Sequence, residues 1–213
     1  MGKNTRSGFT LIELLVVIGI ISLLAVVLLP NIIGGKEKAN KLADAANLRW
    51  HYQVLTELRD QKKLPVRGGC RFVLAPWYRG IVEKTEANLN RYFNPAQSVE
   101  DSKVKELLEI GVAKIWPREE AITSLDTHYA GRSEKFFVGM LSGNEAWLAD
   151  DCELAMPFPS GSIHVLYGDG NVKELLADPD LLKYGWKLED VKEGKLFDVG
   201  PSSPHPDLKK LDK

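Results

Sequence analysis

The sequence has few of the residues that mark several common classes of protein. Its 213 residues include only two cysteines, too few for a disulfide-stapled miniprotein or a four-cysteine zinc module. It has no glycine-rich low-complexity tract and no internal repeat at solenoid spacing. Lysine and arginine total 28 against 29 aspartate and glutamate residues, so the formal net charge is −1. A generic nucleic-acid-binding protein usually carries a basic excess, so the composition argues against that class.

The motifs of common enzyme classes are also missing. The chain has no phosphate-binding loop, no dinucleotide fingerprint and no G-x-S-x-G nucleophile elbow. Its four histidines form no zinc-type pair with a cysteine or with one another: His51, His128, His164 and His205. We therefore expect a protein that is not an enzyme and that has no cofactor, with His164 as an ordinary strand residue.

What the sequence does have is one long apolar run near its start. The run extends from Phe9 to Leu29 and carries a single charge, Glu13. As a helix, its 21 residues would be roughly 32 Å long, which is enough for the hydrocarbon core of a bilayer. The basic residues Lys3 and Arg6 precede it and favour a cytoplasmic N-terminus. A cleaved secretory signal peptide fits less well, because its apolar region is shorter, about 7–15 residues.

A plain membrane anchor does not explain Glu13. A carboxylate within a membrane segment costs about 2.5–3.5 kcal/mol on insertion scales and normally has a partner nearby. No cationic residue lies within a helical turn of Glu13. We therefore expect its partner to be on another molecule, or to be a charge that is created when the chain is processed.

The segment Ser7–Leu14 resembles the cleavage and methylation signature of type IV prepilins and type II secretion pseudopilins. In that family, a membrane peptidase cuts after the glycine and methylates the new first residue. The resemblance implies a leader peptide of residues 1–8, cleavage between Gly8 and Phe9, and N-methylation of Phe9. Glu13 would then pair with a terminal amine, which can belong to a neighbouring subunit, and would select one register during assembly.

The same resemblance implies a structural assembly protein and a set of partners. These are further copies or related pseudopilins in a helical filament, the prepilin peptidase, the inner-membrane assembly platform and the lipid bilayer, with no nucleic acid. Residues 9–29 would be a single-pass transmembrane and assembly helix in the inner membrane, with the head on the periplasmic side. A type II secretion-like pseudopilus is favoured. A type IV pilus subunit and a non-polymerising, membrane-anchored binding module are the alternatives.

For the fold class, the pattern predicts an α+β protein with one long helix and a small head. Pro30 lies where family members often have a helix-kinking proline, and it should kink or loosen the helix. An amphipathic stem helix should follow over residues 30–63 and end at the breakers Leu64–Gly69. Apolar positions at helical spacing predict its packing face: Ala39, Leu42, Ala43, Ala46, Trp50, Val54 and Leu58.

The head, residues 64–198, is expected to hold an antiparallel sheet of about four strands packed on the stem helix. We predict two hairpins, Lys135–Leu141 with Glu145–Ala149 and Ser162–Tyr167 with Val172–Leu175. Two further short elements are predicted, a strand at Arg71–Leu74 and a helix at Ser102–Glu109 that Gly111 ends. Residues 199–213 are rich in proline and serine at their start, and we expect a mobile tail.

Three segments of the head resemble a pseudopilin-like group that is abundant in planctomycete-type bacteria and has a C-terminal Asp-Gly motif: Thr127–Arg132, Leu148–Asp151 and Val165–Val172. The chain departs from that group at three places. Pro159 and Asn171 stand where members often have histidine, and Arg91–Pro95 lacks a cysteine-proline pair. Any role tied to those residues does not carry over to this chain.

Two possible sites in the head stay open. Cys70 and Cys152 can form a disulfide if the head lies outside the cytoplasm, and the alternative is two separate thiols. Four acidic residues form a possible Ca²⁺ site, since some major pseudopilins bind calcium through an acidic loop near the C-terminus: Asp150, Asp151, Glu153 and Asp169. Their spacing matches no calcium-loop template, and the alternative is a set of solvated acids in turns.

Overall fold

The structure is a computed structural model of the 213-residue chain. It describes residues 10–61, 67–97, 101–136, 143–151, 158, 160–176, 182–185 and 199–212, without the side chains of residues 27–33. The chain forms two compact units, Met1–Ala39 and Asn40–Lys213. The predicted leader, residues 1–8, lies outside the described residues.

A single helix, α1, spans Leu11–Asp60 and contributes to both units. Its 50 residues confirm the predicted long N-terminal helix, which ends close to the predicted position. The helix continues without interruption through Pro30, Gly34 and Gly35, so the expected break in its hydrogen-bonded course is absent from this described segment. A bend of its axis at Pro30 stays a prediction.

The buried face of the stem, the part of α1 from residue 40 onward, differs from the predicted one. Leu42 is 72% exposed, and Ala43 and Ala46 are exposed as well. The residues that are fully buried follow alternating steps of four and three positions: Asp44, Leu48, His51, Leu55 and Leu58. This spacing is one helical face. The prediction is confirmed for Leu58 and, as half-buried residues, for Trp50 and Val54, and it is wrong for the exposed positions, because it counted apolar residues only whereas two inward positions are polar.

The head contains a five-stranded antiparallel sheet in the spatial order β4–β3–β2–β1–β5. The strands are β1 Tyr129–Arg132, β2 Ala146–Asp150, β3 Ser162–Tyr167, β4 Val172–Leu176 and β5 Leu211–Asp212. The β3–β4 hairpin confirms the second predicted hairpin, with Gly170 at a φ of 84° in its turn. The first is wrong, because β2 pairs with β1 and not with Lys135–Leu141, of which residues 137–141 lie outside the described part.

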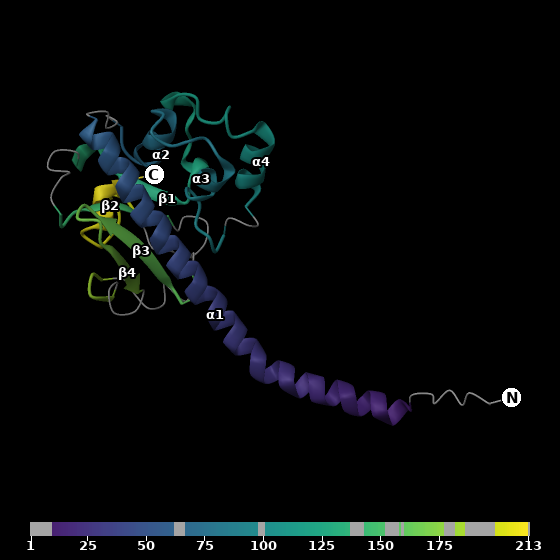
Figure 1. Ribbon diagram of the computed structural model, residues 1–213. Coiled ribbons are helices and arrows are strands. Elements are labelled where there is room, and N and C mark those ends of the chain that lie inside the picture. The colour runs from purple at the N-terminus through teal and green to yellow at the C-terminus, as the bar shows by residue number, and fades with distance from the viewer. Residues whose placement is uncertain are drawn as a thin grey trace. The chain divides into compact units, whose positions relative to one another are not determined.

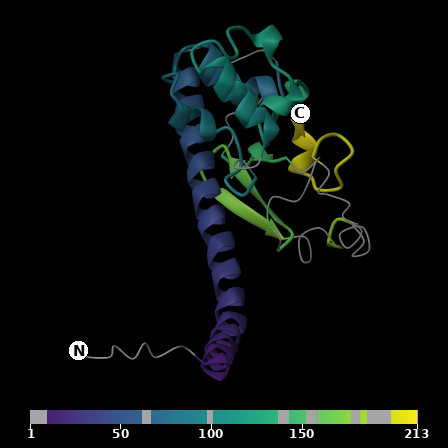
Figure 2. The ribbon, with the colours of Figure 1, turned by 90° about the vertical axis from the view of Figure 1, so that its right-hand side faces the viewer.

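Both faces of the sheet are covered (Figures 1 and 2). On one face, Trp147 and Leu166 belong to the same buried core as the leucines of the stem. On the other face, Ile163 and Val165 pack with Leu208 and other residues of the C-terminal segment. Figure 2 shows this yellow segment on the side of the green strands that faces away from α1. Because successive side chains of a strand point to opposite faces of the sheet, every second side chain of β3 faces the stem.

The C-terminal segment is part of the fold and is not the mobile tail that we predicted. Residues 199–212 contain the 3₁₀ turn Leu208–Lys210 and β5, which pairs with β1 through Leu211 and Asp212. Leu208 and Leu211 are fully buried. Proline and serine make the start of this segment resemble a linker, but two buried leucines further on hold it to the sheet. The head therefore extends to Asp212, beyond the predicted boundary at residue 198.

Three short helices complete the head: α2 Cys70–Tyr78, α3 Glu86–Asn90 and α4 Ser102–Ile110. Helix α4 confirms the prediction, with Asp101 as its N-cap and Gly111 at a φ of 91° after its end. Helix α2 replaces the predicted strand at Arg71–Leu74. Most of its side chains are buried, and a short, continuous apolar run does not distinguish a strand from a buried helix.

The chain before α2 passes very close to β1. The Gly69 N–H donates to the Arg132 carbonyl oxygen at 3.0 Å. A Cβ atom on Gly131 would clash with the Gly69 carbonyl group, and one on Gly68 would clash with the Arg132 backbone. Gly68 and Gly131 therefore permit a close backbone contact that no larger residue allows.

Candidate functional site

The first turn of α1 brings Thr10 and Glu13 together. The backbone N–H and the hydroxyl group of Thr10 donate to Glu13 Oε2 at 2.8 and 2.7 Å. The Glu13 N–H donates in return to Thr10 Oγ1 at 3.3 Å. This reciprocal pair is a capping box, and the Thr-x-x-Glu spacing is the sequence signal from which it could have been predicted. The expectation that the partner of Glu13 lies on another molecule is therefore incomplete.

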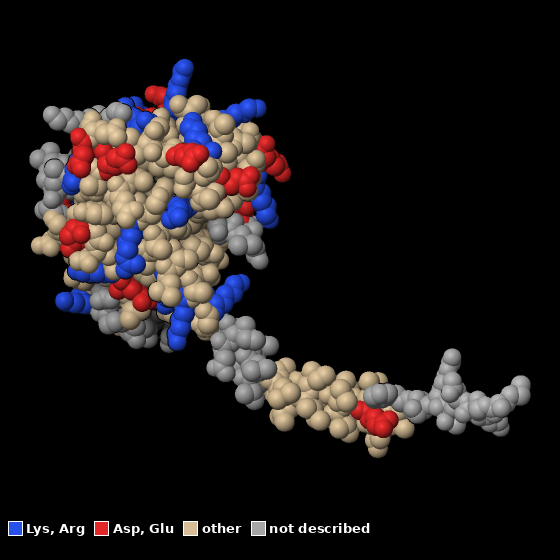
Figure 3. Space-filling model, viewed as in Figure 1, with Lys and Arg blue, Asp and Glu red and all other residues tan. Residues whose placement is uncertain are grey.

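The helix that follows exposes apolar side chains on every side. From Leu11 to Val26, each large apolar residue is between 44% and 84% exposed. The Ser22 hydroxyl donates to the Ile18 carbonyl oxygen at 2.7 Å, so this polar group is satisfied within the helix. Figure 3 shows a nearly continuous tan surface here, whereas acidic and basic side chains alternate over the head. Such a surface needs cover from lipid or from other polypeptides.

The predicted transmembrane segment, Phe9–Leu29, begins outside the described residues, and the side chains of residues 27–29 are not described either. Within the part of the chain that the structure covers, no helix is both long enough and apolar enough to cross a membrane.

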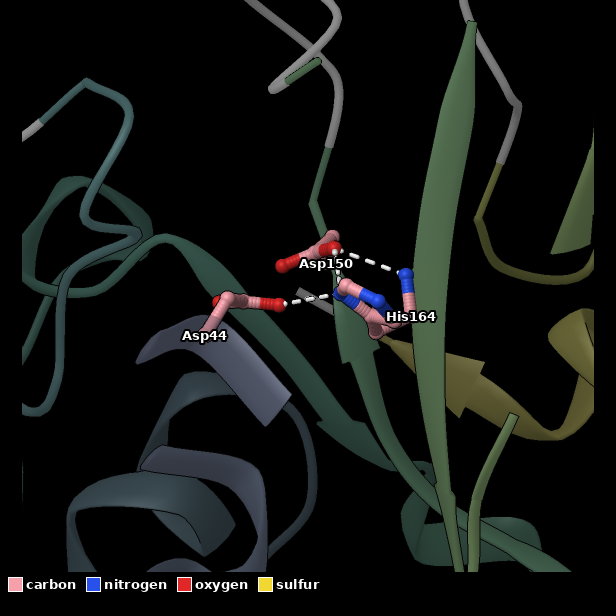
Figure 4. Close-up of side chains that lie close together, drawn as sticks. All are labelled: Asp44, Asp150 and His164. Atoms are coloured by element: carbon pink, nitrogen blue, oxygen red, sulfur yellow. Dashed lines mark hydrogen bonds and ion pairs between the residues drawn. The ribbon is translucent and has the colours of Figure 1, made fainter. Parts of the chain in front are cut away.

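A second group of polar side chains lies inside the head unit, where the stem meets the sheet (Figure 4). We call Asp44 of α1, Asp150 of β2 and His164 of β3 the aspartate–histidine cluster. All three are buried, with exposed fractions of 0%, 0% and 6%. His164 Nδ1 lies 2.6 Å from Asp44 Oδ2 and 3.8 Å from Asp150 Oδ2. The backbone N–H of His164 donates to Asp150 Oδ2 at 2.8 Å.

Asn94 donates to the Oδ1 atom of both carboxylates in this cluster, and Tyr129 donates to that of Asp44. Asn94 Nδ2 donates to Asp44 Oδ1 and to Asp150 Oδ1, in each case at 3.0 Å. The Tyr129 hydroxyl donates to Asp44 Oδ1 at 2.7 Å. The inner Oδ2 atoms of both aspartates are consequently left on the side of the imidazole ring.

The electrostatics of the cluster follow from its burial. Burial and the neighbouring Asp44 carboxylate raise the pKa of Asp150 well above its usual range, against hydrogen bonds from His164 and Asn94 that lower it. Two adjacent carboxylates that are removed from water repel each other strongly unless a proton or a cation lies between them. Either a proton or a cation near the Oδ2 atoms would remove this repulsion.

A family model matches the start of the chain. The family model described as the prokaryotic N-terminal methylation motif matches residues 3–29. We call residues 3–29 the pilin-like segment, after the resemblance on which the prediction rests. This pilin-like segment contains Gly8, Phe9 and Glu13, the three residues on which the predicted resemblance rests.

Two curated proteins that are similar to the chain agree with the pilin-like segment. The Type IV wide pilus major component PilA4 of Thermus thermophilus is 47% identical over 58 residues, 24% of this chain and 44% of the relative. The Type II secretion system core protein G of Aeromonas hydrophila is 51% identical over 41 residues, 19% of this chain and 29% of the relative. The chain thus spans less than half the length of the curated relatives that it matches. No solved structure matches the chain significantly.

Several predicted site residues lie outside the described part of the chain. Among them are Gly8 and Phe9 of the pilin-like segment, so cleavage and methylation stay predictions. Cys152 is also outside, whereas Cys70 is 2% exposed at the start of α2 and is bonded to no cysteine within the described residues. Burial raises the pKa of the Cys70 thiol. The predicted disulfide between the two cysteines is therefore untested.

The structure does not bring the four predicted calcium ligands together. The N–H of Asp169 donates to the Gly143 carbonyl oxygen just before β2, whereas Asp150 ends β2. At about 3.3 Å per strand residue, roughly 13 Å or more separates the two acids. Asp169 instead accepts hydrogen bonds from Asn171, Asp151 follows Asp150, and Glu153 lies outside the described residues. One ion cannot be bound by both ends of this strand.

Proposed function

We propose that this chain is a pilin-like filament subunit that is made as a precursor and cleaved between Gly8 and Phe9. The observation that carries the proposal is the methylation-motif match over residues 3–29, joined to a helix whose apolar side chains stay exposed. A prepilin peptidase would remove residues 1–8 and methylate the new amino group of Phe9. Cleavage also removes Lys3 and Arg6, so that the apolar helix becomes the end of the chain.

Before assembly, Phe9–Leu29 would lie in the inner membrane with the head on the periplasmic side. Lipid would cover the apolar side chains, which are exposed in the isolated chain. The polar groups of this segment suit that setting, because Ser22 and Glu13 already have hydrogen-bond partners within the helix. The basic residues before the run favour the orientation with a cytoplasmic N-terminus.

During assembly, Glu13 would pair with the methylated amine of a neighbouring subunit. The capping box gives the carboxylate two donors from Thr10, but it supplies no positive charge. In a medium of low dielectric constant, an amine near this carboxylate is strongly attractive, and an incorrect register leaves the charge unpaired. A head-to-tail contact of this kind generates an open helical filament. The inner-membrane assembly platform would extract each subunit from the bilayer.

We favour a type II secretion-like pseudopilus because three segments of the head, Thr127–Arg132, Leu148–Asp151 and Val165–Val172, resemble a pseudopilin-like group. The similarity to the Aeromonas hydrophila protein supports the same class. A type IV pilus subunit is the second candidate, and it is supported by the longer alignment with the Thermus thermophilus pilus component. A non-polymerising membrane anchor is the third candidate. Replacement of Glu13 distinguishes it from the first two, because only a filament subunit needs this carboxylate for assembly.

The experiment is to express the full chain together with a prepilin peptidase and an assembly platform, and to follow both membrane insertion and filament incorporation. Glu13→Gln should insert as well as the original chain but fail to enter filaments, because its side chain cannot balance an amine. Thr10→Ala is the matched control. It removes one donor to Glu13 and keeps the carboxylate, so incorporation should largely persist. Filaments of Glu13→Gln at the original level would contradict the assembly role.

A further inference from the structure

The aspartate–histidine cluster consists of residue types that bind metal ions. The spacing of these residues in the sequence does not indicate such a site. One ligand atom from each of Asp44, Asp150 and His164 lies within 4.8 Å of the other two. The residues come from α1, β2 and β3, and hydrogen bonds and burial hold all three in place. The group therefore exists only when the stem and the sheet of the head unit are packed together.

Charge balance within the cluster favours a divalent cation. The group contains two carboxylates, and the residues that hold their outer oxygens, Asn94 and Tyr129, are neutral donors. A divalent ion bound to a neutral imidazole and two carboxylates leaves no net charge in the buried site.

The second observation is the arrangement of donors around the ligands. Each carboxylate has its Oδ1 atom fixed by a donor from outside the three-residue group, and its Oδ2 atom lies on the side of His164 Nδ1, at 2.6 Å for Asp44 and 3.8 Å for Asp150. The amide of Asn94 is itself oriented, because its Oδ1 accepts the Ala96 N–H at 2.9 Å. Such outer-shell hydrogen bonds are typical of metal sites, where they orient the ligands and tune the affinity.

We propose that Asp44, Asp150 and His164 bind Zn²⁺ and clamp the stem helix to the sheet. Imidazole nitrogen and carboxylate oxygen are ordinary zinc ligands, at about 2.0–2.2 Å from the ion. In a tetrahedral site, those bond lengths place ligand atoms roughly 3.4 Å apart. The observed separations of 2.6 and 3.8 Å lie on either side of that value, so small side-chain movements are sufficient.

The experiment uses the full-length chain in detergent, stripped of metal with a chelator and then equilibrated with Zn²⁺ alone. The expected result is one zinc ion per chain by elemental mass spectrometry, and a melting temperature of the head that rises with free Zn²⁺ concentration. Replacing zinc with Co²⁺ should give the visible absorption of a tetrahedral site with nitrogen and oxygen ligands. No stoichiometric zinc in the original chain would overturn the proposal.

Variants locate the ion. Asp150→Asn and His164→Gln should abolish stoichiometric binding, and Tyr129→Phe, which removes an outer donor, should weaken it about 10–100-fold. Asp169→Asn is the matched control, since Asp169 lies in an exposed turn and should leave the affinity unchanged. Unchanged binding in the first two variants would place the ion elsewhere and contradict the proposal.

A variant could also lose zinc because it does not fold. X-ray absorption on the original chain therefore identifies the ligands of the ion independently of the variants. The proposal requires an ion with one imidazole ligand, oxygen neighbours and no sulfur. A sulfur ligand, or two imidazoles, would also contradict the proposed ligand set. None of these results depends on whether the chain enters a filament, so failure of this site and failure of the proposed function can be told apart.

Discussion

His51 makes the stability of the head sensitive to acid. Its side chain is fully buried among aromatic rings, with the ring centroids of Tyr92 and Tyr129 at 4.9 and 5.3 Å. The hydrogen bond between Nε2 and the Arg91 carbonyl oxygen, at 2.9 Å, requires a proton on Nε2. The other ring nitrogen, Nδ1, is buried without a hydrogen-bond partner among the described residues. Protonation of Nδ1 would therefore place an unpaired charge in the core.

The size of this loss of stability follows from the shift in the pKa of His51. Burial lowers the pKa of His51 from 6.5 to about 4. The unfolded chain takes up the proton on this histidine at a higher pH than the folded chain does. The contribution of His51 to the free energy of unfolding is therefore complete above about pH 6.5 and falls as the pH decreases towards 4. At 1.36 kcal/mol per pKa unit, the full loss is about 3 kcal/mol.

The assay compares the free energy of unfolding of the original chain and His51→Gln, by urea denaturation followed with tryptophan fluorescence, from about pH 8 to about pH 4. Glutamine can still donate to the Arg91 carbonyl group but does not titrate in this range. The difference between the two chains should be constant above about pH 6.5 and should shift by about 3 kcal/mol in favour of the variant near pH 4. A difference that stays flat across the range would show that His51 is not the source of the acid sensitivity.

Three further substitutions test the packing of the head. Gly131→Ala should destabilise it by about 1–3 kcal/mol in urea unfolding, because the new Cβ meets the Gly69 backbone, whereas the control Gly34→Ala has open space around its Cβ and should not destabilise. Leu211→Ala should lower the free energy of unfolding by about 2–5 kcal/mol in the same assay, since this leucine is fully buried in the C-terminal segment. A loss below about 1 kcal/mol would instead support the prediction of a mobile tail. Lys41→Ala should cost less than about 1 kcal/mol and only at low salt, because the 2.7 Å ion pair of Lys41 with Glu174 is partly exposed.

The parts of the fold that the sequence predicts correctly are those with a local signal. The first part of the long helix follows from a continuous apolar run and its stem from apolar residues at helical spacing, and the β3–β4 hairpin follows from alternation on either side of an Asp-Gly turn. The pilin-like segment is likewise contiguous, so its residues could be recognised together. In each case, the physical cause of the structure lies within about twenty neighbouring residues.

The parts that could not be predicted depend on contacts between distant segments. Asp44 and His51 face inward on the stem only because the head supplies partners for them, so apolar periodicity places the buried face incorrectly. The C-terminal segment is held by its pairing with β1, which lies some eighty residues earlier in the chain. The aspartate–histidine cluster joins positions 44, 150 and 164, and no spacing rule connects them.

Processing of this chain as a prepilin underlies the proposed function, and it can be checked by intact mass together with N-terminal sequencing. The protein should be taken from its native membrane, in cells where the prepilin peptidase is active. We expect a chain that begins at Phe9, with one additional methyl group on its amino terminus. A chain that still begins at Met1 would contradict the proposal, and would leave an ordinary membrane anchor whose Glu13 serves only as a helix cap.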